Sequence, residues 1–367
     1  MEASGLASIA AVGNRRLADI ATPFALIDAR LLQRNIAEMQ QTMGEIGASL
    51  RPHFKTHRTT WIAQRQRDAG AIGLTVATVA QLAKVTRDLG CPVLVSSLLQ
   101  VCAATATDLR AAAAGGEVTF AIESDWSIES LRAALGPDVD AEAMIEVEAG
   151  CLRSGVPPAE CGELARAAAR SGFRVTGVFS YPGQSYIPGR AADAAEQEQA
   201  ALEQGAAELR RAGFDPVHIS AGSTPTMPFA RSGVATEYRP GTYVFGDRQQ
   251  HGLGAMARSA LALTVVATVV AIHGDRVVLD AGGKALGRDA PRWLEGFGQL
   301  AGGSESLVTR LYDHHSVIES YDGEPLHVGE RVAVLPNNVN SVMALLRSAW
   351  LSEDGETAEE LLPQPDR

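Results

Sequence analysis

The chain has 367 residues, 46% of them hydrophobic, and a mean hydropathy of zero, so it has enough apolar material for a large buried core. Its net charge of −11, without any Lys- or Arg-rich run, argues against a nucleic-acid-binding surface. No apolar stretch reaches the roughly 18 to 20 residues that cross a bilayer, and neither a signal peptide nor a CxxC cysteine pair is evident, so we expect a cytoplasmic protein that binds no membrane.

From about residue 24 to residue 246, short β-type runs alternate with amphipathic helical stretches. The run Phe24–Ile27 is followed by Asp28, which stands where a helix N-cap belongs. Eight further strand–helix units favour a closed (β/α)8 barrel of the TIM type, with an open doubly wound sheet as the alternative. The eight predicted strands are Ser49–Phe54, Ala71–Val76, Pro92–Ser97, Glu117–Ile122, Glu142–Val147, Phe173–Ser180, Pro216–Ser220 and Thr236–Phe245, with crossover helices such as Val79–Leu89 and Ala191–Ala212.

The pattern changes after about residue 250. Alternating or β-branched runs predict strands over Ala260–Ile272, Arg276–Asp280, Ser306–Ile318 and Glu330–Leu335, and no helix of crossover length is expected before Met343–Trp350. We therefore predict two domains, a barrel over residues 22–248 and a mainly β domain formed by residues 1–21 and 249–367. Residues 351–367 are acidic and contain proline, so we expect them to fray.

Lysine is rare in this chain, because only Lys55, Lys84 and Lys284 occur among 32 basic residues counted as Lys and Arg. A guanidinium group cannot act as an amine nucleophile, so these three lysines are the candidates for such a role, although chance alone also explains so small a number. Lys55 lies in Arg51–His57, at the C-terminal end of the first predicted barrel strand, where barrels carry their chemistry. Neighbouring cations lower a lysine pKa and favour imine formation, but a solvated basic loop fits the spacing equally well.

The stretch Arg51–His57, together with Thr22-Pro23 and Asn35, resembles the opening of the D-threonine aldolase and D-serine dehydratase family, which shares the fold of bacterial alanine racemase. The resemblance implies pyridoxal 5′-phosphate (PLP) held as an imine on Lys55, a C-terminal β domain, a homodimer and a small amino-acid substrate. Further similar stretches follow in order along nearly the whole chain: Glu146–Val156, Ser180–Gly183, Ser220–Thr224, Thr236–Tyr243, Asp280–Leu286, Asp313–Glu319 and Val328–Asn340.

The segment after the seventh predicted strand, Ser220–Pro225, has small residues that allow close backbone approach to a phosphate, although an ordinary Gly/Ser turn is the alternative. The resemblance implies that this segment cradles the phosphate of PLP and that other matching residues lie near the cofactor. Arg153 also fits a surface loop, and Pro182 departs from the family pattern beside Tyr181. The implied cofactor-binding residues are Lys55, His53, Arg153, Tyr181, Gly222, Ser223, Thr224 and Tyr243, whereas Lys284 is expected to be structural or interfacial.

In the family that the chain resembles, the last motifs supply a divalent metal site. This chain departs from the family pattern in those motifs. His315 stands at the position of the family's histidine, but Asn338 and Asn340 occupy the two ligand positions that follow Pro336. Carboxamide oxygens bind zinc or manganese weakly compared with imidazole, thiolate or carboxylate. We therefore expect that a divalent metal is absent and that the two asparagines contact the substrate, with a simple turn role as the alternative.

The resemblance implies a PLP-dependent lyase that acts on a β-hydroxy-D-amino acid, with D-threonine aldolase-like cleavage slightly ahead of D-serine dehydratase-like elimination. PLP serves as an electron sink, while the protein selects which bond at Cα breaks. Lys55 is the imine-forming residue, and His57, Tyr181 and His315 are the candidates for the general base. The asparagines keep a metal-independent racemase or epimerase open, and a non-catalytic PLP-binding protein is the third alternative.

Overall fold

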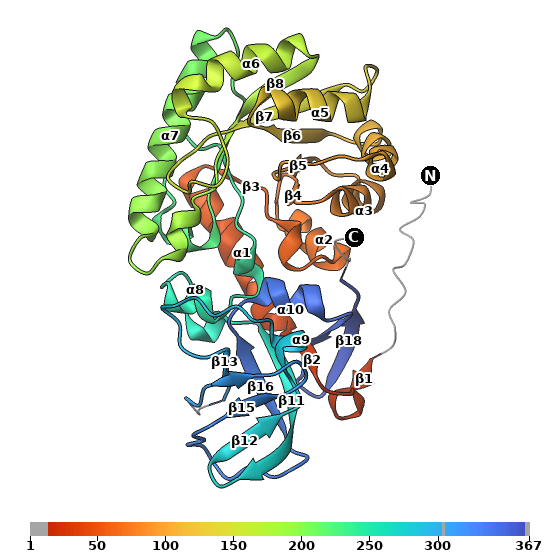
Figure 1. The fold of residues 1–367 in the computed structure, drawn as a ribbon, viewed down its shortest axis with the longest axis vertical. Coiled ribbons are helices and arrows are strands. Elements are labelled where there is room, and N and C mark those ends of the chain that lie inside the picture. The colour runs from red at the N-terminus through yellow and green to blue at the C-terminus, as the bar shows by residue number, and fades with distance from the viewer. Residues whose placement is uncertain (1–13, 303–304, 364–367) are drawn as a thin grey trace. The chain divides into compact units, whose positions relative to one another are not determined.

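The computed structural model describes residues 14–302 and 305–363, which form two compact units (Figure 1). One unit comprises residues 34–259, and the other combines residues 14–33 with residues 260–363. Among the helices of these described stretches, none combines the length and apolar character that crossing a membrane requires. Residues 1–13 and 364–367, which the sequence assigned to the β-rich domain, lie outside the described residues.

Eight parallel strands in the first unit form a closed barrel, as predicted, so the open-sheet alternative is wrong. The ladder runs from β4 in chain order to β10 and then to β3. The ring closes between β3 and β4, because the Ile72 amide donates to the Leu50 carbonyl (2.9 Å) and the Thr75 amide donates to the Pro52 carbonyl (2.8 Å). The strands are β3 (Ser49–Leu50), β4 (Leu74–Val76), β5 (Val93–Val95), β6 (Val118–Ile122), β7 (Ala141–Glu146), β8 (Phe173–Phe179), β9 (His218–Ala221) and β10 (Glu237–Tyr238).

Helices follow most of the barrel strands, and their starts show why they form where they do. The side chains of Thr59, Thr78 and Ser124 each accept a backbone N–H of the first turn of α2, α3 and α5, at 3.2 Å in each case. Only a proline-containing 3-10 segment, Thr224–Phe229, follows β9. The helices are α1 (Ala29–Ile46), α2 (Thr60–Asp68), α3 (Val79–Leu89), α4 (Ala103–Ala114), α5 (Asp125–Leu135), α6 (Cys161–Arg170), α7 (Ala191–Arg211) and α8 (Arg248–Gly252).

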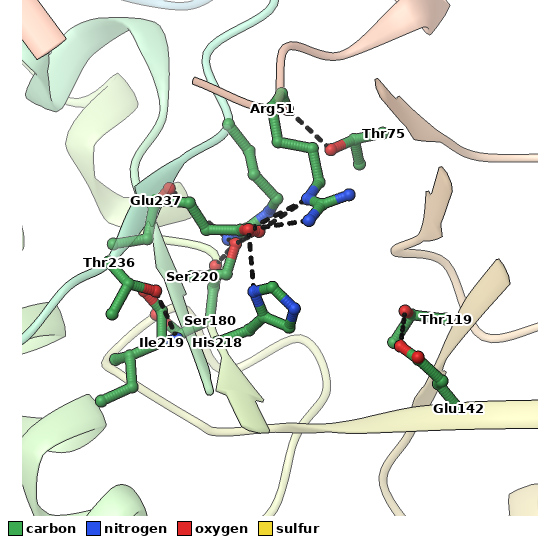
Figure 2. Close-up of polar contacts among 12 residues, drawn as sticks. Arg51, Thr75, Thr119, Glu142, Ser180, His218, Ile219, Ser220, Thr236 and Glu237 are labelled. Carbon is green, nitrogen blue, oxygen red and sulfur yellow. Dashed lines mark hydrogen bonds and ion pairs between the residues drawn. The ribbon is translucent and has the colours of Figure 1, made fainter. Parts of the chain in front are cut away.

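The barrel interior contains a buried ion pair beside its apolar packing (Figure 2). The Arg51 guanidinium donates to both carboxylate oxygens of Glu237 at 2.9 to 3.0 Å. The Ser220 hydroxyl donates to the same carboxylate at 2.6 Å, and His218 Nδ1 lies 3.4 Å from it. These contacts join the segment after β3 to β9 and β10, so they stabilise the part of the barrel where these three strands meet.

The second unit is mainly β, as predicted, with the long strand β11 at its centre. β11 pairs antiparallel with β2, β12 and β16. Two short helices, α9 (Gly283–Leu286) and α10 (Val339–Leu345), complete this unit. Its strands are β1 (Arg15–Arg16), β2 (Phe24–Asp28), β11 (Leu263–His273), β12 (Arg276–Leu279), β13 (Gly298–Leu300), β14 (Arg310–Leu311), β15 (Ser316–Ile318), β16 (Arg331–Pro336), β17 (Ala349–Ser352) and β18 (Thr357–Leu361).

Several local predictions differ from the structure, among them the strand predicted over Thr236–Phe245, of which only Glu237–Tyr238 is strand and Thr242–Val244 is a 3-10 turn. The run Phe24–Ile27, assigned to the barrel domain, lies in β2 of the other unit, where it pairs with β11 and β17. The predicted helix Met343–Trp350 is instead α10, which begins after the N-cap Asn338, and Trp350 belongs to β17. The acidic tail does not fray up to residue 363, because β17 and β18 pair around a turn in which Asp354 accepts two backbone N–H groups at 2.8 Å.

Candidate active site at the carboxyl end of the barrel strands

Lys55 lies directly beyond β3, in a 3-10 turn over Phe54–Thr56 that leads into α2. The backbone around it is held on both sides. The His53 amide donates to the Pro240 carbonyl at 3.1 Å, and the Arg58 guanidinium donates to the Lys55 carbonyl at 3.2 Å. Lys55 therefore projects from a fixed backbone at the end of the barrel where the sequence placed the chemistry.

The environment of Lys55 favours its neutral amine. Although its side chain remains exposed in part, the surrounding protein lowers the pKa of Lys55 from 10.5 to about 8, first through desolvation and then through the charges of Arg153 and Arg239. At pH 7 on the order of one tenth of the amine is thus unprotonated, far more than for an ordinary lysine. The predicted lowering of this pKa by neighbouring cations has a structural basis, although the main cation is Arg153 rather than a histidine.

Arg153 and Tyr181 lie together. The guanidinium carbon of Arg153 is 4.7 Å from the centroid of the Tyr181 ring, and its Nη2 lies 3.1 Å from Glu146 Oε1. Glu146 is buried at the end of β7 and also accepts the Ser154 hydroxyl at 2.8 Å. Burial raises the pKa of Tyr181, so its phenol is neutral at physiological pH. The structure thus brings Lys55, Arg153 and Tyr181 into one electrostatic neighbourhood.

Two polar atoms near Lys55 have no hydrogen-bond partner in the described part of the chain. These buried atoms are His53 Nδ1 and Thr56 Oγ1, while His53 Nε2 lies 3.3 Å from the Ser96 hydroxyl. Burial, Lys55 and Arg239 together keep the pKa of His53 well below its usual range. Buried polar atoms are nearly always paired in native proteins. The two orphaned atoms therefore fit a site that receives a polar ligand such as PLP.

His57 is buried, and both of its ring nitrogens are engaged. The Thr59 amide donates to Nδ1 at 3.3 Å, so the proton is assigned to Nε2, which lies 3.1 Å from Gln66 Oε1. The Gln66 amide group then donates to the Tyr243 hydroxyl at 2.9 Å. Burial lowers the pKa of His57 to about 4. The histidine expected as a candidate base therefore lies at the start of a hydrogen-bonded relay that ends on Tyr243.

The predicted phosphate segment is ordered mainly by bonds within the protein. Gly222 adopts a φ of +90°, and a Cβ there would lie 2.7 Å from the Tyr238 ring, so only glycine fits. Its N–H is donated to Glu198, which leaves it unavailable for a phosphate. Ser223 and Thr224 are buried, and Thr224 Oγ1 accepts the Tyr243 amide at 3.2 Å. Gly222 thus shapes the turn, while the Thr224 hydroxyl lies beside Tyr243 and the Ser223 hydroxyl lies 3.1 Å from that of Ser185.

Several functional candidates in the barrel were missed from the sequence. Arg239 is buried, donates to the Ser220 hydroxyl at 2.6 Å and also bonds the Ser180 carbonyl. It lies within the stretch Thr236–Tyr243 that carried the family resemblance, which was the available signal. Glu198 occupies a buried position on α7 between Ala194 and Leu202. An acid on the apolar face of a helix is a signal in itself, since Glu is rarely buried without a reason.

The remaining predicted residues lie in the β-rich unit. His315 is exposed just before β15 and lines a cavity of about 430 Å³ together with His273, Arg276, Arg310 and Tyr312. Asn338 caps α10, since its Oδ1 accepts the Asn340 amide at 2.9 Å, and its Nδ2 donates to Asp289 at 3.2 Å. Over the residues that the structure describes, no group of three or more His, Cys, Asp or Glu side chains is arranged to hold a metal ion.

Comparisons with known proteins agree with this arrangement. The model of the alanine racemase N-terminal domain matches residues 27–249, and a putative serine dehydratase domain matches residues 262–351. The chain is 33% identical over 348 residues to D-threo-3-hydroxyaspartate dehydratase of Delftia sp. strain HT23, covering 86% of this chain and 90% of that protein. The solved structure of that dehydratase gives a TM-score of 0.83 at 28% identity, over 95% of this chain and 99% of the other.

Two aldolases are also similar. The 3-hydroxy-D-aspartate aldolase of Paracoccus denitrificans is 25% identical over 342 residues, which cover 87% of this chain and 85% of that protein. The structure of D-threonine aldolase from Filomicrobium marinum gives a TM-score of 0.80 at 25% identity, over 95% of this chain and 96% of the other. The predicted resemblance is therefore confirmed. The chain belongs to the alanine racemase-like family of PLP enzymes that includes the D-serine dehydratases and D-threonine aldolases, and it is a PLP-dependent lyase of this hydroxyamino-acid type.

Proposed function

We propose that the protein is a lyase for a β-hydroxy-D-amino acid, that it holds PLP on Lys55, and that it works without a divalent metal. The observation that carries the proposal is the position of Lys55 beyond β3 with a pKa of about 8. The dehydratase at 33% identity favours elimination of water over Cα–Cβ cleavage, which reverses the slight preference for aldolase chemistry drawn from the sequence. Both reactions would use the same cofactor, held by the same Lys55 amine.

The residues present fit PLP at this end of the barrel. When bound, PLP withdraws electrons from the bonds at the substrate Cα. Lys55 supplies the amine that attaches the cofactor, and the hydroxyls of Ser223, Thr224 and Tyr243 are suited to its phosphate. Arg153 retains more than half of its side-chain exposure (53%) and can bind a substrate carboxylate, while its stacking on the Tyr181 ring fixes its direction.

Proton transfer needs a group with a free lone pair near the substrate. His57 does not meet this requirement, so we assign it a positioning role toward Tyr243. The Lys55 amine does meet it, because a pKa of about 8 lets it accept a proton from Cα and return one near neutral pH. The raised pKa of Tyr181 keeps its phenol protonated, so that it can donate a hydrogen bond to a leaving hydroxyl. His315 stays a candidate base through its position in the sequence.

The metal-free part of the proposal depends on the donor atoms in the β-rich unit. Asn338 uses its amide oxygen to cap α10 and its amide nitrogen to bond Asp289. Asn340 donates its side-chain nitrogen to the same Asn338 oxygen at 3.1 Å. Neutral amide oxygens are poor ligands for zinc or manganese, and the Asn338 oxygen already accepts two N–H groups. The same bonds make a turn role for these asparagines as well supported as the predicted substrate contact.

An amino-acid panel tests the proposal. D-serine, D-threonine and both diastereomers of 3-hydroxy-D-aspartate are incubated with the PLP-loaded enzyme, with and without EDTA, in deuterated water. We expect keto acid and ammonia, or glycine and aldehyde, at rates that EDTA does not change. Deuterium at Cα with an inverted enantiomer and no other product would establish the racemase alternative, whereas a yellow protein that converts nothing would establish the PLP-binding alternative.

The pH dependence of PLP attachment follows from the lowered pKa of Lys55. Only the neutral amine attacks the aldehyde, so the second-order rate of attachment is expected to rise tenfold per pH unit below about pH 8 and to level off above it. Stopped-flow absorbance from pH 6 to pH 10 measures the profile, with a lysine model peptide as reference. A rate that still rises as steeply at pH 10 as for the peptide would contradict the lowered pKa.

The relay from His57 to Tyr243 predicts that replacing Gln66 weakens PLP binding and lowers stability. Replacing Gln66 with leucine removes its bonds to both residues and leaves the His57 ring N–H buried without an acceptor. We expect PLP affinity to fall about tenfold and the free energy of unfolding to fall by about 1–3 kcal/mol. Gln64→Leu, on the exposed face of the same helix, is the matched control, and equal PLP titrations of the two variants would contradict the relay.

A further inference from the structure

Glu198 is a buried acid of the barrel unit that has no role in the proposed reaction. Glu198 lies in the middle of α7, on the face that otherwise packs apolar or small residues such as Ala194, Ala195 and Leu202 against the barrel. Only 1% of Glu198 is exposed. Burying a carboxylate is unfavourable unless it is paired and hydrogen-bonded, and burial raises the pKa of Glu198 to about 7. A side chain held there at such a cost needs a specific reason.

The contacts of Glu198 supply that reason, because they reach the two strand ends that carry the cofactor candidates. The Ser180 hydroxyl donates to Glu198 Oε1 at 2.8 Å, and the Gly222 amide donates to both carboxylate oxygens at 3.0 Å. Ser180 directly precedes Tyr181, and Gly222 directly precedes Ser223. A single carboxylate thus joins the segment after β8, which contains Tyr181, to the predicted phosphate segment after β9, which contains Ser223.

Two further observations agree with this link. Ser185 and Ser223 place their hydroxyl oxygens 3.1 Å apart, so the same two segments are joined a second time nearer their tips. The buried guanidinium of Arg239 bonds the Ser180 carbonyl, and its charge partly offsets the effect of burial on Glu198. The polar contacts around Glu198 therefore converge on these segments rather than spreading over the helix packing.

We propose that Glu198 is a positioning residue that sets the phosphate segment for PLP. By accepting the Gly222 N–H, its carboxylate holds a glycine whose φ of +90° would otherwise be free to change, and this fixes where Ser223 and Thr224 present their hydroxyls. Through Ser180 it couples that geometry to Tyr181. This inference rests on the proposed PLP function of the barrel.

The test compares the affinities of PLP and pyridoxal, which both attach to Lys55 but differ in the phosphate. Each affinity is measured by absorbance for the wild type, Glu198→Ala, Glu198→Gln, Ser180→Ala and the exposed control Glu203→Gln of the same helix. We expect Glu198→Ala to weaken PLP binding at least about tenfold while pyridoxal binding changes less than about twofold. Glu198→Gln should recover most of the lost PLP affinity, because its amide oxygen can still accept the Gly222 N–H. For Ser180→Ala we expect the PLP affinity to fall about threefold to fivefold.

Other outcomes overturn the proposal. It is wrong if Glu198→Ala keeps the wild-type ratio of the two affinities, or if PLP and pyridoxal binding fall together, since that would show general destabilisation. If Glu198→Ala fails to fold, an unchanged ratio of the two affinities in Ser180→Ala contradicts the link. A wild-type protein that attaches neither compound would instead refute the PLP function itself.

Discussion

Replacing Lys55 with alanine is expected to abolish covalent retention of PLP and to lower kcat by at least about a thousandfold, because no other amine of the barrel unit lies at the carboxyl ends of its strands. Lys84, the other lysine of that unit, is in α3 and pairs with Asp88 at 2.9 Å. The change also removes the base that we assign to the Cα proton. Absorbance after gel filtration and product formation measure the two losses separately.

The matched controls are Lys84→Ala and Lys284→Ala, which we expect to stay within about twofold of the wild type. Lys284 is exposed and lies 3.8 Å from Asp313, an interaction of the kind that contributes little. Lys55→Arg keeps a positive charge but cannot form the imine, so it should be as inactive as Lys55→Ala. Turnover by Lys55→Arg would show that charge rather than the amine matters at this position.

The largest expected effect on stability comes from Glu237 in the barrel interior (Figure 2). Replacing Glu237 with glutamine leaves the buried Arg51 guanidinium without a counter-charge, and removing one partner of a buried ion pair typically costs about 3–5 kcal/mol. Urea unfolding of the purified variant measures the loss. Glu142→Gln is the matched control on β7, because Glu142 pairs with Arg174, which is 63% exposed, and should cost less than about 1 kcal/mol. Equal losses would contradict the role of the buried network.

The same network predicts a pH dependence with a definite sign. Burial raises the pKa of Glu237, but His218, Arg51 and Ser220 outweigh burial and bring the pKa well below its ordinary value of 4.5. A carboxyl group whose pKa is lowered by folding stabilises the fold above its unfolded pKa and loses that contribution as the pH falls further. The stability gap between wild type and Glu237→Gln should therefore narrow below about pH 4. A gap that is constant from pH 7 to pH 3 would contradict this assignment.

The order of strands and helices in the barrel could be predicted from the sequence, because its signals are local, although several strands are shorter than predicted. The bounds of α3 agree with the predicted range Val79–Leu89, where Thr78 caps the helix and apolar residues recur at helical spacing. The strand Phe24–Asp28 was assigned to the wrong unit, because a short apolar run fits either sheet and only long-range pairing with β11 and β17 decides. The strand β18 was missed because its sequence is acidic and its partner, β17, was predicted as helix.

The positions of the candidate site residues were predictable where a motif carried them and not where packing decided them. Lys55, Arg153 and Tyr181 lie together as the family resemblance implied. The burial of His57 could not be foreseen, since its relay depends on Gln66, nine residues along the chain, and on Tyr243, 177 residues beyond Gln66. The role proposed for Glu198 likewise depends on Gly222 and Ser180, which lie beside it only in the folded barrel.

The central claim is that the amine of Lys55 condenses with the aldehyde of PLP, and borohydride reduction followed by peptide mapping tests it most directly. The account predicts one pyridoxyl group per chain, on the peptide that contains Lys55. A label on Lys284 or Lys84 instead, or a reduced protein that carries no label after loading with PLP, would contradict it.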